Sequence, residues 1–270
     1  MRVVRCDGSP EAVSELDAAL RIALDGGAAL APVAPGQAPP FRDPGPGQVA
    51  LTTSGATGQP KWVQLRAEAL HASAVATHAR LGGPGRWLLA LPAQHSAGLQ
   101  VLVRAALAGT QAAVLDLRGG FDPGRFGAAA RRLAGQRCYT ALVPTQLARL
   151  LDADPGALAG FDAVLLGGAA APDTLVRRAQ AAGVAVLTTY GMTETAGGCV
   201  YAGWPLDGAR VRLDTAEVTG TGRIEIAGPM LATGYLDDPG QTAAVFRDGW
   251  FLTSDLGRLD PDGRLQVLGR

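Results

Sequence analysis

Residues 49–61 read Val-Ala-Leu-Thr-Thr-Ser-Gly-Ala-Thr-Gly-Gln-Pro-Lys, an apolar run followed by a run rich in hydroxyl groups and glycine. The apolar part predicts a buried strand, and the polar part predicts a loop that leaves this strand. Lys61, which closes the stretch, is the only lysine among the 24 basic residues of the chain. Backbone N–H groups, hydroxyls and one ammonium group are suited to binding phosphate oxygens. The stretch therefore predicts a phosphate-binding loop, with an ordinary Ser/Thr/Gly turn as the alternative.

The chain on both sides of this loop alternates between strand and helix patterns. Short apolar runs predict strands at 49–53, 86–91, 111–115, 138–143, 162–166 and 184–189, and helical periodicity predicts helices at 66–80, 97–108, 123–134, 144–152 and 172–182. An earlier helix is expected to begin at Ser9-Pro10, and the six prolines within 31–48 predict a loop there. This alternation predicts an α/β fold with mainly parallel sheets covered by helices.

The pattern changes after Gly191. Short runs at 211–213, 223–226 and 264–267 alternate in period two between glycine-rich turns. Such runs are typical of antiparallel strands. We therefore expect two parts, an α/β part over residues 1–190 and a smaller β-rich subdomain over residues 191–270.

Composition argues against several classes of partner. The formal net charge is zero and no basic cluster is longer than a pair, so neither nucleic acid nor an anionic membrane is an expected partner. The longest apolar stretch is too short for membrane insertion, and residues 1–10 lack the apolar region of a signal peptide. The scattered Cys6, Cys138 and Cys199 predict reduced thiols and a cytoplasmic location.

Two further segments carry groups that could bind a nucleotide. Tyr190-Gly191-Met192-Thr193-Glu194-Thr195 follows an apolar run, and could supply an aromatic ring for a base and a carboxylate for Mg²⁺. Residues 249–257 place Asp255 just after an aromatic strand, where a carboxylate could accept both ribose hydroxyls. The alternatives are a plain strand-to-loop turn and an aspartate at the end of a hairpin.

Three familiar motifs are absent. Pro60 precedes Lys61 and Trp62 follows it, so the first loop is not a Walker A loop. No G-x-G-x-x-G follows a predicted strand and no G-x-S-x-G occurs, which argues against a Rossmann dinucleotide site and an α/β-hydrolase.

In this order and spacing, the three segments resemble the core motifs of the adenylate-forming acyl-CoA synthetase superfamily. The resemblance extends from about Val49 to Arg270 and includes three more signatures, at 91–98, 167–172 and 228–235. Residues 143–151 and 197–201 are similar to those of o-succinylbenzoate–CoA ligases of menaquinone biosynthesis, especially short actinobacterial ones. The implied fold is the N-terminal domain of the adenylate-forming enzymes.

The resemblance implies a two-step reaction that uses ATP, Mg²⁺ and coenzyme A. A substrate carboxylate attacks the α-phosphorus of ATP and releases pyrophosphate, and the CoA thiol then attacks the acyl-adenylate. The implied phosphate-binding residues are Thr53, Ser54, Gly55, Thr57, Gly58 and Lys61, and the implied catalytic residues are Thr193, Glu194 and His95, with Glu194 also the metal ligand. Adenine and ribose would contact Gly167, Gly168, Ala169, Tyr190, Gly191, Asp255 and Arg270, and the acyl group would contact His95, Arg104 and Thr145.

Arg104 adds a physical argument about the substrate. It lies nine residues after His95 on an otherwise apolar predicted helix. A buried arginine needs a partner, and o-succinylbenzoate carries a second carboxylate that does not react. The alternatives are a structural ion pair or a side chain that reaches solvent for Arg104, and a histidine satisfied at a helix start for His95.

The sequence departs from the family pattern in three places. Ala56 stands where the family usually has a hydroxyl, and Ser254 stands where it usually has glycine. The chain ends at Arg270, where family members continue into a mobile C-terminal domain that brings a second lysine. We therefore expect an N-terminal domain with low activity by itself. Another aryl- or acyl-CoA ligase, a non-catalytic acyl-adenylate binding module, and a homodimer all stay open.

Overall fold

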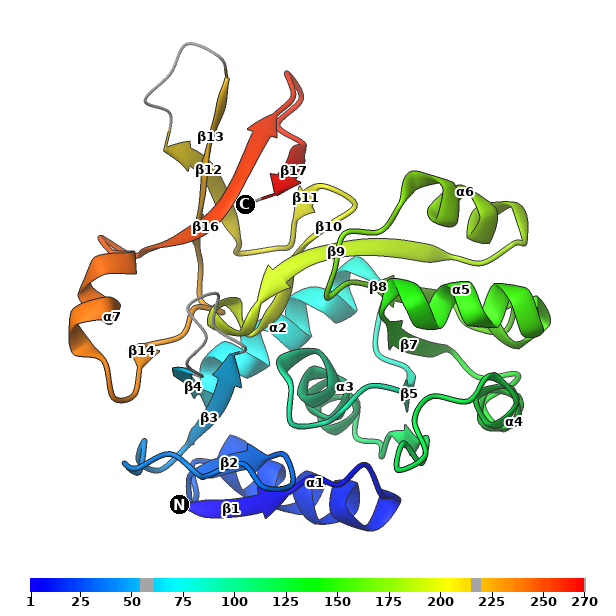
Figure 1. The fold of residues 1–270 in the computed structure, drawn as a ribbon, viewed down its shortest axis with the longest axis horizontal. Helices are drawn as coiled ribbons and strands as arrows, with labels where there is room; N and C mark the ends of the chain where they lie inside the picture. Colours follow the sequence, from blue (N-terminus) through cyan, green and yellow to red (C-terminus); the bar gives the residue numbers. More distant parts are fainter. Residues whose placement is uncertain (54–60, 215–219, 270) are drawn as a thin grey trace.

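The computed structural model describes residues 1–53, 61–214 and 220–269, which form three sheets (Figure 1). The first sheet has the order β1-β2-β3-β4-β14, made of β1 (Arg2–Arg5), β2 (Leu30–Val33), β3 (Gln48–Thr53), β4 (Lys61–Arg66) and β14 (Gly234–Tyr235). Strands β1 to β3 are parallel, whereas β4 is antiparallel to both β3 and β14. A late segment of the chain thus completes the sheet that holds Lys61.

The second sheet contains the parallel core of the molecule. Its order is β11 (Trp204–Pro205), β10 (Gly197–Tyr201), β9 (Val186–Met192), β8 (Ala163–Leu166), β7 (Cys138–Leu142), β5 (Arg86–Leu89) and β6 (Ala113–Val114). The strands from β9 to β6 are parallel, and β10 and β11 are antiparallel. Helices α4 (Pro123–Arg131), α5 (Pro144–Ala153) and α6 (Asp173–Ala181), with the 3₁₀ turn η1 (Pro155–Leu158), pack on one face around buried residues such as Phe126 and Leu147.

The third sheet is antiparallel throughout. It has the order β12 (Arg210–Asp214), β13 (Thr221–Ala227), β16 (Trp250–Leu259) and β15 (Phe246–Arg247), and β17 (Leu265–Gly269) also pairs with β16. Helix α7 (Pro239–Val245) contacts both β14 and β16, so it connects this sheet to the first one.

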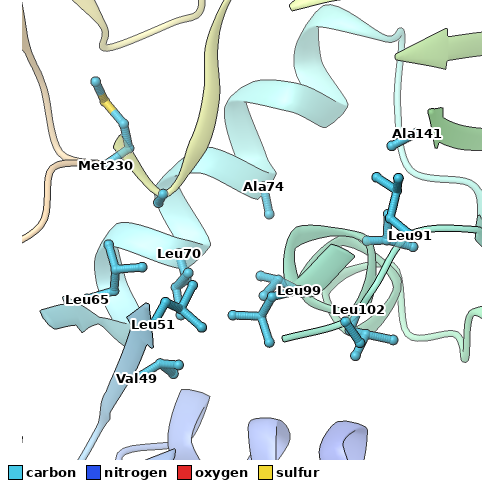
Figure 2. Packing of buried hydrophobic residues seen from close by; sticks show 14 of the residues in the cluster. Val49, Leu51, Leu65, Leu70, Ala74, Leu91, Leu99, Leu102, Ala141 and Met230 are labelled. Atoms are coloured by element: carbon cyan, nitrogen blue, oxygen red, sulfur yellow. The ribbon is translucent and has the colours of Figure 1, made fainter. Parts of the chain in front are cut away.

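The main apolar core lies between the first two sheets. Helices α1 (Pro10–Leu24), α2 (Ala67–Arg80) and α3 (Ser96–Leu107) fill this space, and α2 contacts both β4 and β10. Figure 2 shows Leu51 and Leu65 from the first sheet close to Leu70 of α2 and Leu99 of α3, and all four are fully buried. Burying one such leucine contributes roughly 1.5–3 kcal/mol. The core therefore fixes β3 and β4, which flank the predicted phosphate loop.

The predicted α/β class and helices are confirmed, and four local predictions need correction. The loop predicted over 31–48 is wrong at its start, since β2 includes Leu30–Val33 and pairs with β1 despite Pro32. The strand predicted at 111–115 is only Ala113–Val114, and β9 continues beyond 189 to Met192. Asp255 lies inside β16 rather than after it.

The division at residue 190 stays a prediction, but the sheets cross it. Strands β10 and β11 extend the second sheet, and β14 joins the first, so the antiparallel sheet begins at β12. Within the described parts of the chain, no helix is both long and apolar enough to cross a membrane.

Candidate active site

The segment Tyr190–Thr195 forms the end of a tight hairpin between β9 and β10. Gly191 lies opposite Gly198, and a Cβ atom at Gly191 would lie 2.2 Å from the Gly197 carbonyl oxygen. The turn itself is η2 (Thr193–Thr195), and Thr195 closes it by accepting from the Met192 N–H at 2.9 Å and donating to the Gly197 carbonyl at 2.7 Å. Only glycine permits this approach of the two strands, which presents Thr193 and Glu194 at the tip.

Glu194 connects this hairpin to the segment that begins with Lys61. Its side chain is 9 % exposed, and its Oε1 accepts a hydrogen bond from the Tyr235 hydroxyl at 2.9 Å. The Lys61 ammonium lies over the ring of the same tyrosine, 5.0 Å from the ring centroid. A cation over an aromatic face is attracted by the ring quadrupole. The first two predicted motifs therefore meet through Tyr235.

Tyr235 is held in place by the backbone around it. It pairs with Val63 across β14 and β4, and its N–H donates to the Thr242 hydroxyl at 2.9 Å. The Ala232 N–H donates to the Glu194 carbonyl at 2.8 Å, so the signature at 228–235 contacts the hairpin directly. The sequence reasoning singled out this signature but gave Tyr235 no role.

Asp255 joins the same region through Tyr190. The Tyr190 hydroxyl donates to Asp255 Oδ2 at 2.9 Å. Burial, and then the Asp255 carboxylate, raise the pKa of the Tyr190 hydroxyl, so it remains a proton donor at neutral pH. The ladder between β13 and β16 is irregular here, because Arg223 pairs with Leu256 and Glu225 with Leu252. Such a bulge redirects a side chain, and it explains how a residue in mid-strand points toward Tyr190.

The remaining predicted residues lie where parallel strands end. Gly167, Gly168 and Ala169 follow β8, Thr145 follows β7 as the second residue of α5, and His95 follows β5 as the N-cap of α3. The carboxyl edge of a parallel sheet is where α/β proteins bind ligands. A Cβ atom at Gly167 would lie 2.3 Å from the Thr189 hydroxyl, so this turn packs closely against the strand that leads to Tyr190. The side chains of His95 and Thr145 are exposed.

Gln146 explains why α5 begins beside this edge. Its side-chain oxygen accepts from the Val143 N–H at 3.1 Å, and its amide donates to the Ala90 carbonyl at 2.8 Å. The buried amide thus fastens the start of α5 to the end of β5, which positions Thr145.

Arg104 occupies a different place, inside the core. Its side chain is 3 % exposed, its Nη2 donates to the Tyr201 hydroxyl at 3.3 Å, and its guanidinium lies 5.1 Å from the centroid of Trp87. Its Nε is buried without a hydrogen-bond partner among the described residues. None of the salt bridges within the described residues includes Arg104. Neither alternative, a structural ion pair or a side chain reaching solvent, is found in the described structure.

Five predicted site residues lie outside the described residues: Ser54, Gly55, Thr57, Gly58 and Arg270. The first four lie between Thr53 and Lys61, which are described. Thr53 is the last residue of β3, Lys61 is the first residue of β4, and the two residues pair with each other. The two ends of the predicted phosphate loop are therefore anchored next to Tyr235 and Glu194.

The site suits a divalent cation shared with phosphates rather than a cation held by protein alone. Within the described ranges, no group of three or more His, Cys, Asp or Glu side chains could hold a metal. Glu194 offers one carboxylate, whose Oε2 makes no recorded hydrogen bond to the described residues. Mg²⁺ commonly takes one or two carboxylates and completes its shell with phosphate oxygens and water, so Glu194 fits this ion with a nucleotide.

The described side chains offer a cation, a buried carboxylate, an aromatic ring and a second carboxylate. Tyr235 contacts both Lys61 and Glu194, and Tyr190 contacts Asp255. Lys61 suits phosphate, Glu194 suits a cation, and Tyr190 with Asp255 suits a nucleoside. The arrangement can hold a nucleoside triphosphate at the edge where His95 and Thr145 would face a second substrate.

Comparisons with known proteins identify the family and the fold of the chain. A family model described as AMP-binding enzyme matches residues 6–236. A probable 2-succinylbenzoate–CoA ligase of Mycobacterium tuberculosis (strain H37Rv) is 51 % identical over 227 residues, which is 82 % of this chain and 57 % of that protein. The chain thus spans a little over half the length of this relative.

Two similar solved structures are of the o-succinylbenzoate CoA synthetase of Bacillus subtilis. One is in complex with the acyl-adenylate intermediate, with a TM-score of 0.76 and 26 % identity, covering 94 % of this chain and 60 % of that one. The other is in complex with ATP and a magnesium ion, again with a TM-score of 0.76 and 26 % identity, covering 94 % and 62 %. The comparisons place the fold among the N-terminal parts of adenylate-forming enzymes.

Proposed function

The chain belongs to the AMP-binding enzyme family, and from that premise we propose that it activates o-succinylbenzoate with ATP as the acyl-adenylate and transfers the acyl group to coenzyme A in menaquinone biosynthesis. The observation that carries the proposal is the pair of contacts Tyr190–Asp255 and Glu194–Tyr235 with Lys61 above Tyr235. These contacts join three segments that are far apart in the sequence. The similarity to 2-succinylbenzoate–CoA ligases supports the choice of acid.

In the first step, a carboxylate oxygen of the acid attacks the α-phosphorus, and the bond from phosphorus to pyrophosphate breaks. Residues 53–61 would bind the β- and γ-phosphates, and Lys61 would neutralise part of their charge. Thr193 lies at the tip of the hairpin, where its hydroxyl can donate to an α-phosphate oxygen. Fixed donors near developing charge lower the barrier without reorganisation of solvent.

Tyr190 and the turn at 167–169 would flank the adenine, and Asp255 would hold the ribose hydroxyls. Mg²⁺, when bound with ATP, would reduce repulsion between phosphate oxygens and the incoming carboxylate. Glu194 is the described residue that fits this ion.

In the second step, the CoA thiol attacks the acyl carbon and AMP leaves. His95 and Thr145 would line the acyl group during both steps.

Arg104 would select an acid with a second carboxylate, and because its guanidinium lies in the core beside Tyr201 and Trp87, this role requires the acyl pocket to extend into the core there. A buried guanidinium without an acidic partner is energetically costly, and a ligand carboxylate would compensate it. The test keeps the protein intact and changes the ligand: o-succinylbenzoate against 4-oxo-4-phenylbutyrate, which lacks the aryl carboxylate. We expect calorimetry to show that o-succinylbenzoate binds at least tenfold more tightly than 4-oxo-4-phenylbutyrate. This difference should be lost in Arg104→Met and retained in Arg118→Met, which changes an exposed arginine. Equal affinities would remove this role.

We further propose that residues 1–270 alone bind ATP and form thioester slowly. We also propose that the protein is located in the reducing environment of the cytoplasm. Lys61 is the only lysine in this sequence, so the second ammonium of the family mechanism must come from elsewhere. The three cysteines are buried free thiols, which supports a reducing compartment.

The decisive experiment measures pyrophosphate release by residues 1–270 with o-succinylbenzoate, ATP and Mg²⁺, beside nucleotide binding by calorimetry. ATP binding with slow, acid-dependent release supports the proposal. Binding of acyl-adenylate with no release favours a non-catalytic module, and a strong preference for another aryl or acyl acid favours a different ligase. Full-rate thioester formation would contradict the role assigned to a second lysine.

A further inference from the structure

Tyr235 lies between two charged groups that the proposed reaction uses. Its hydroxyl donates to Glu194 Oε1 at 2.9 Å, and the Lys61 ammonium lies 5.0 Å from the centroid of its ring. One side chain therefore contacts the carboxylate that suits the cation and the ammonium that suits the phosphates. We propose that Tyr235 is a positioning residue, whose hydroxyl fixes one oxygen of Glu194 and whose ring orients Lys61 for Mg²⁺-dependent ATP binding. This inference rests on the proposed function.

The backbone around Tyr235 leaves it little freedom. A Cβ atom at Gly234 would lie 2.3 Å from Thr242 Cγ2, so β14 packs closely on α7 at this point. The Tyr235 ring packs edge-on against Phe246, with ring centroids 6.0 Å apart and an interplanar angle of 68°. Contacts on the backbone and on the ring both restrict the side chain, which is what a positioning residue requires.

The chemistry of the contact also suits this role. An ionised carboxylate can only accept hydrogen bonds, and the Tyr235 hydroxyl has a proton to donate, so the 2.9 Å contact fixes Oε1 of Glu194. With Oε1 occupied by this donor, Oε2 of Glu194 remains for a cation. Groups that orient a metal ligand commonly change metal affinity by about 10- to 100-fold when removed.

The test variant is Tyr235→Phe, which removes the hydroxyl and keeps the ring under Lys61. Calorimetric titrations of residues 1–270 would measure ATP with Mg²⁺, ATP with EDTA, and AMP with EDTA. We expect Mg²⁺-dependent ATP affinity to fall about tenfold, and the two affinities without Mg²⁺ to stay within twofold. Higher Mg²⁺ should restore part of the loss.

Two further variants separate positioning from a merely structural role. Tyr235→Leu also removes the ring, so it should weaken ATP binding in EDTA as well. In a Glu194→Gln background, Tyr235→Phe should cause no additional loss, because both changes act on one interaction. The matched control is Tyr139→Phe, which removes another buried hydroxyl, bonded to the Leu81 and Gly83 carbonyls away from the site. It should leave all three titrations unchanged.

The outcomes distinguish this inference from the function on which it rests. If the unmodified chain fails to bind ATP with Mg²⁺, the proposed function fails and the inference fails with it. If the unmodified chain binds and Tyr235→Phe binds equally well, only the inference is overturned. An equal loss of AMP and ATP affinity in Tyr235→Phe would likewise overturn it, since that pattern marks general damage to the site.

Discussion

Lys61 is the residue whose charge matters most for the proposed binding of ATP over AMP. It begins β4, opposite Thr53, and its ammonium is already oriented by the Tyr235 ring. A hydrogen bond to a charged group contributes about 1.5–3 kcal/mol. Lys61→Ala should therefore weaken ATP binding roughly 10- to 100-fold and leave AMP binding nearly unchanged, as measured by calorimetry. The control is Arg66→Ala at the exposed far end of the same strand. An equal loss for AMP would place Lys61 elsewhere on the nucleotide.

His78 connects the buried arginine to the pH dependence of stability. It is 6 % exposed, and burial together with the nearby Arg104 charge lowers its pKa from 6.5 to about 4. The folded protein therefore resists protonation that the unfolded chain accepts below pH 6.5. The free energy of unfolding should fall as the pH drops from about 6.5 to 4, by up to about 3 kcal/mol from this group.

Urea unfolding at pH 7 and at pH 4.5 measures this effect. His78→Phe should reduce the difference between the two pH values, whereas His71→Phe, at an exposed position on the same helix, should leave it unchanged. A difference that is the same in all three proteins would show that folding does not lower the pKa of His78.

At the scale of elements, the hairpin β9–β10 carries the site by bringing two backbones unusually close. A Cβ atom at Gly191 would lie 2.2 Å from the Gly197 carbonyl oxygen, so there is no room for a side chain at this position. Gly191→Ala should destabilise the protein by about 3 kcal/mol and weaken every nucleotide. Gly183→Ala is the comparison, because its φ is +78° but open space surrounds it, and it should cost only about 1 kcal/mol. Similar losses in thermal unfolding would refute the steric argument.

The same hairpin shows how far sequence patterns reach. The run Val184–Thr189 predicts a strand that ends before the motif, although β9 continues through Tyr190 to Met192. The extension is stabilised by pairing with β10, which period and composition do not reveal. Glycine at 191 was the available signal, since a glycine inside a strand marks a close backbone approach.

Two strands and one side-chain contact show why other parts of the fold and the site were not predicted. Strand β4 has a period-two pattern, since Val63 and Leu65 are buried and alternate with more exposed neighbours, but the pattern follows directly on the hydroxyl- and glycine-rich stretch and no strand is predicted there. The prolines that follow strand β2 predict a loop and conceal the strand. Strand β2 forms because it pairs with β1, and its own composition does not indicate a strand. The contact between Tyr190 and Asp255 joins residues 65 positions apart, and only the bulge in β16 makes it.

At the scale of the whole molecule, the site is a junction of three sheets. Lys61 and Tyr235 come from the first sheet, Tyr190 and Glu194 from the second sheet and its hairpin, and Asp255 from the third (Figure 1). Each sheet has its own hydrogen-bond ladders, and the cross-contacts Tyr190–Asp255 and Glu194–Tyr235 are polar. Such junctions open more readily than sheet interiors, so a nucleotide that spans them should slow their exchange with solvent.

This arrangement predicts a different protection pattern for each nucleotide. AMP would reach the hairpin and the bulge of β16, whereas the outer phosphates of ATP would also reach the start of β4 beside Lys61. Hydrogen exchange with AMP should therefore slow in peptides covering β9, η2 and β16, and exchange with ATP and Mg²⁺ should slow in those and in β4. Peptides from α1, which packs on β1 and β2 away from the β9–β10 hairpin (Figure 1), should exchange equally in all states. If ATP and AMP protected the same peptides, the outer phosphates would not lie at Lys61, and the three sheets would not share one nucleotide.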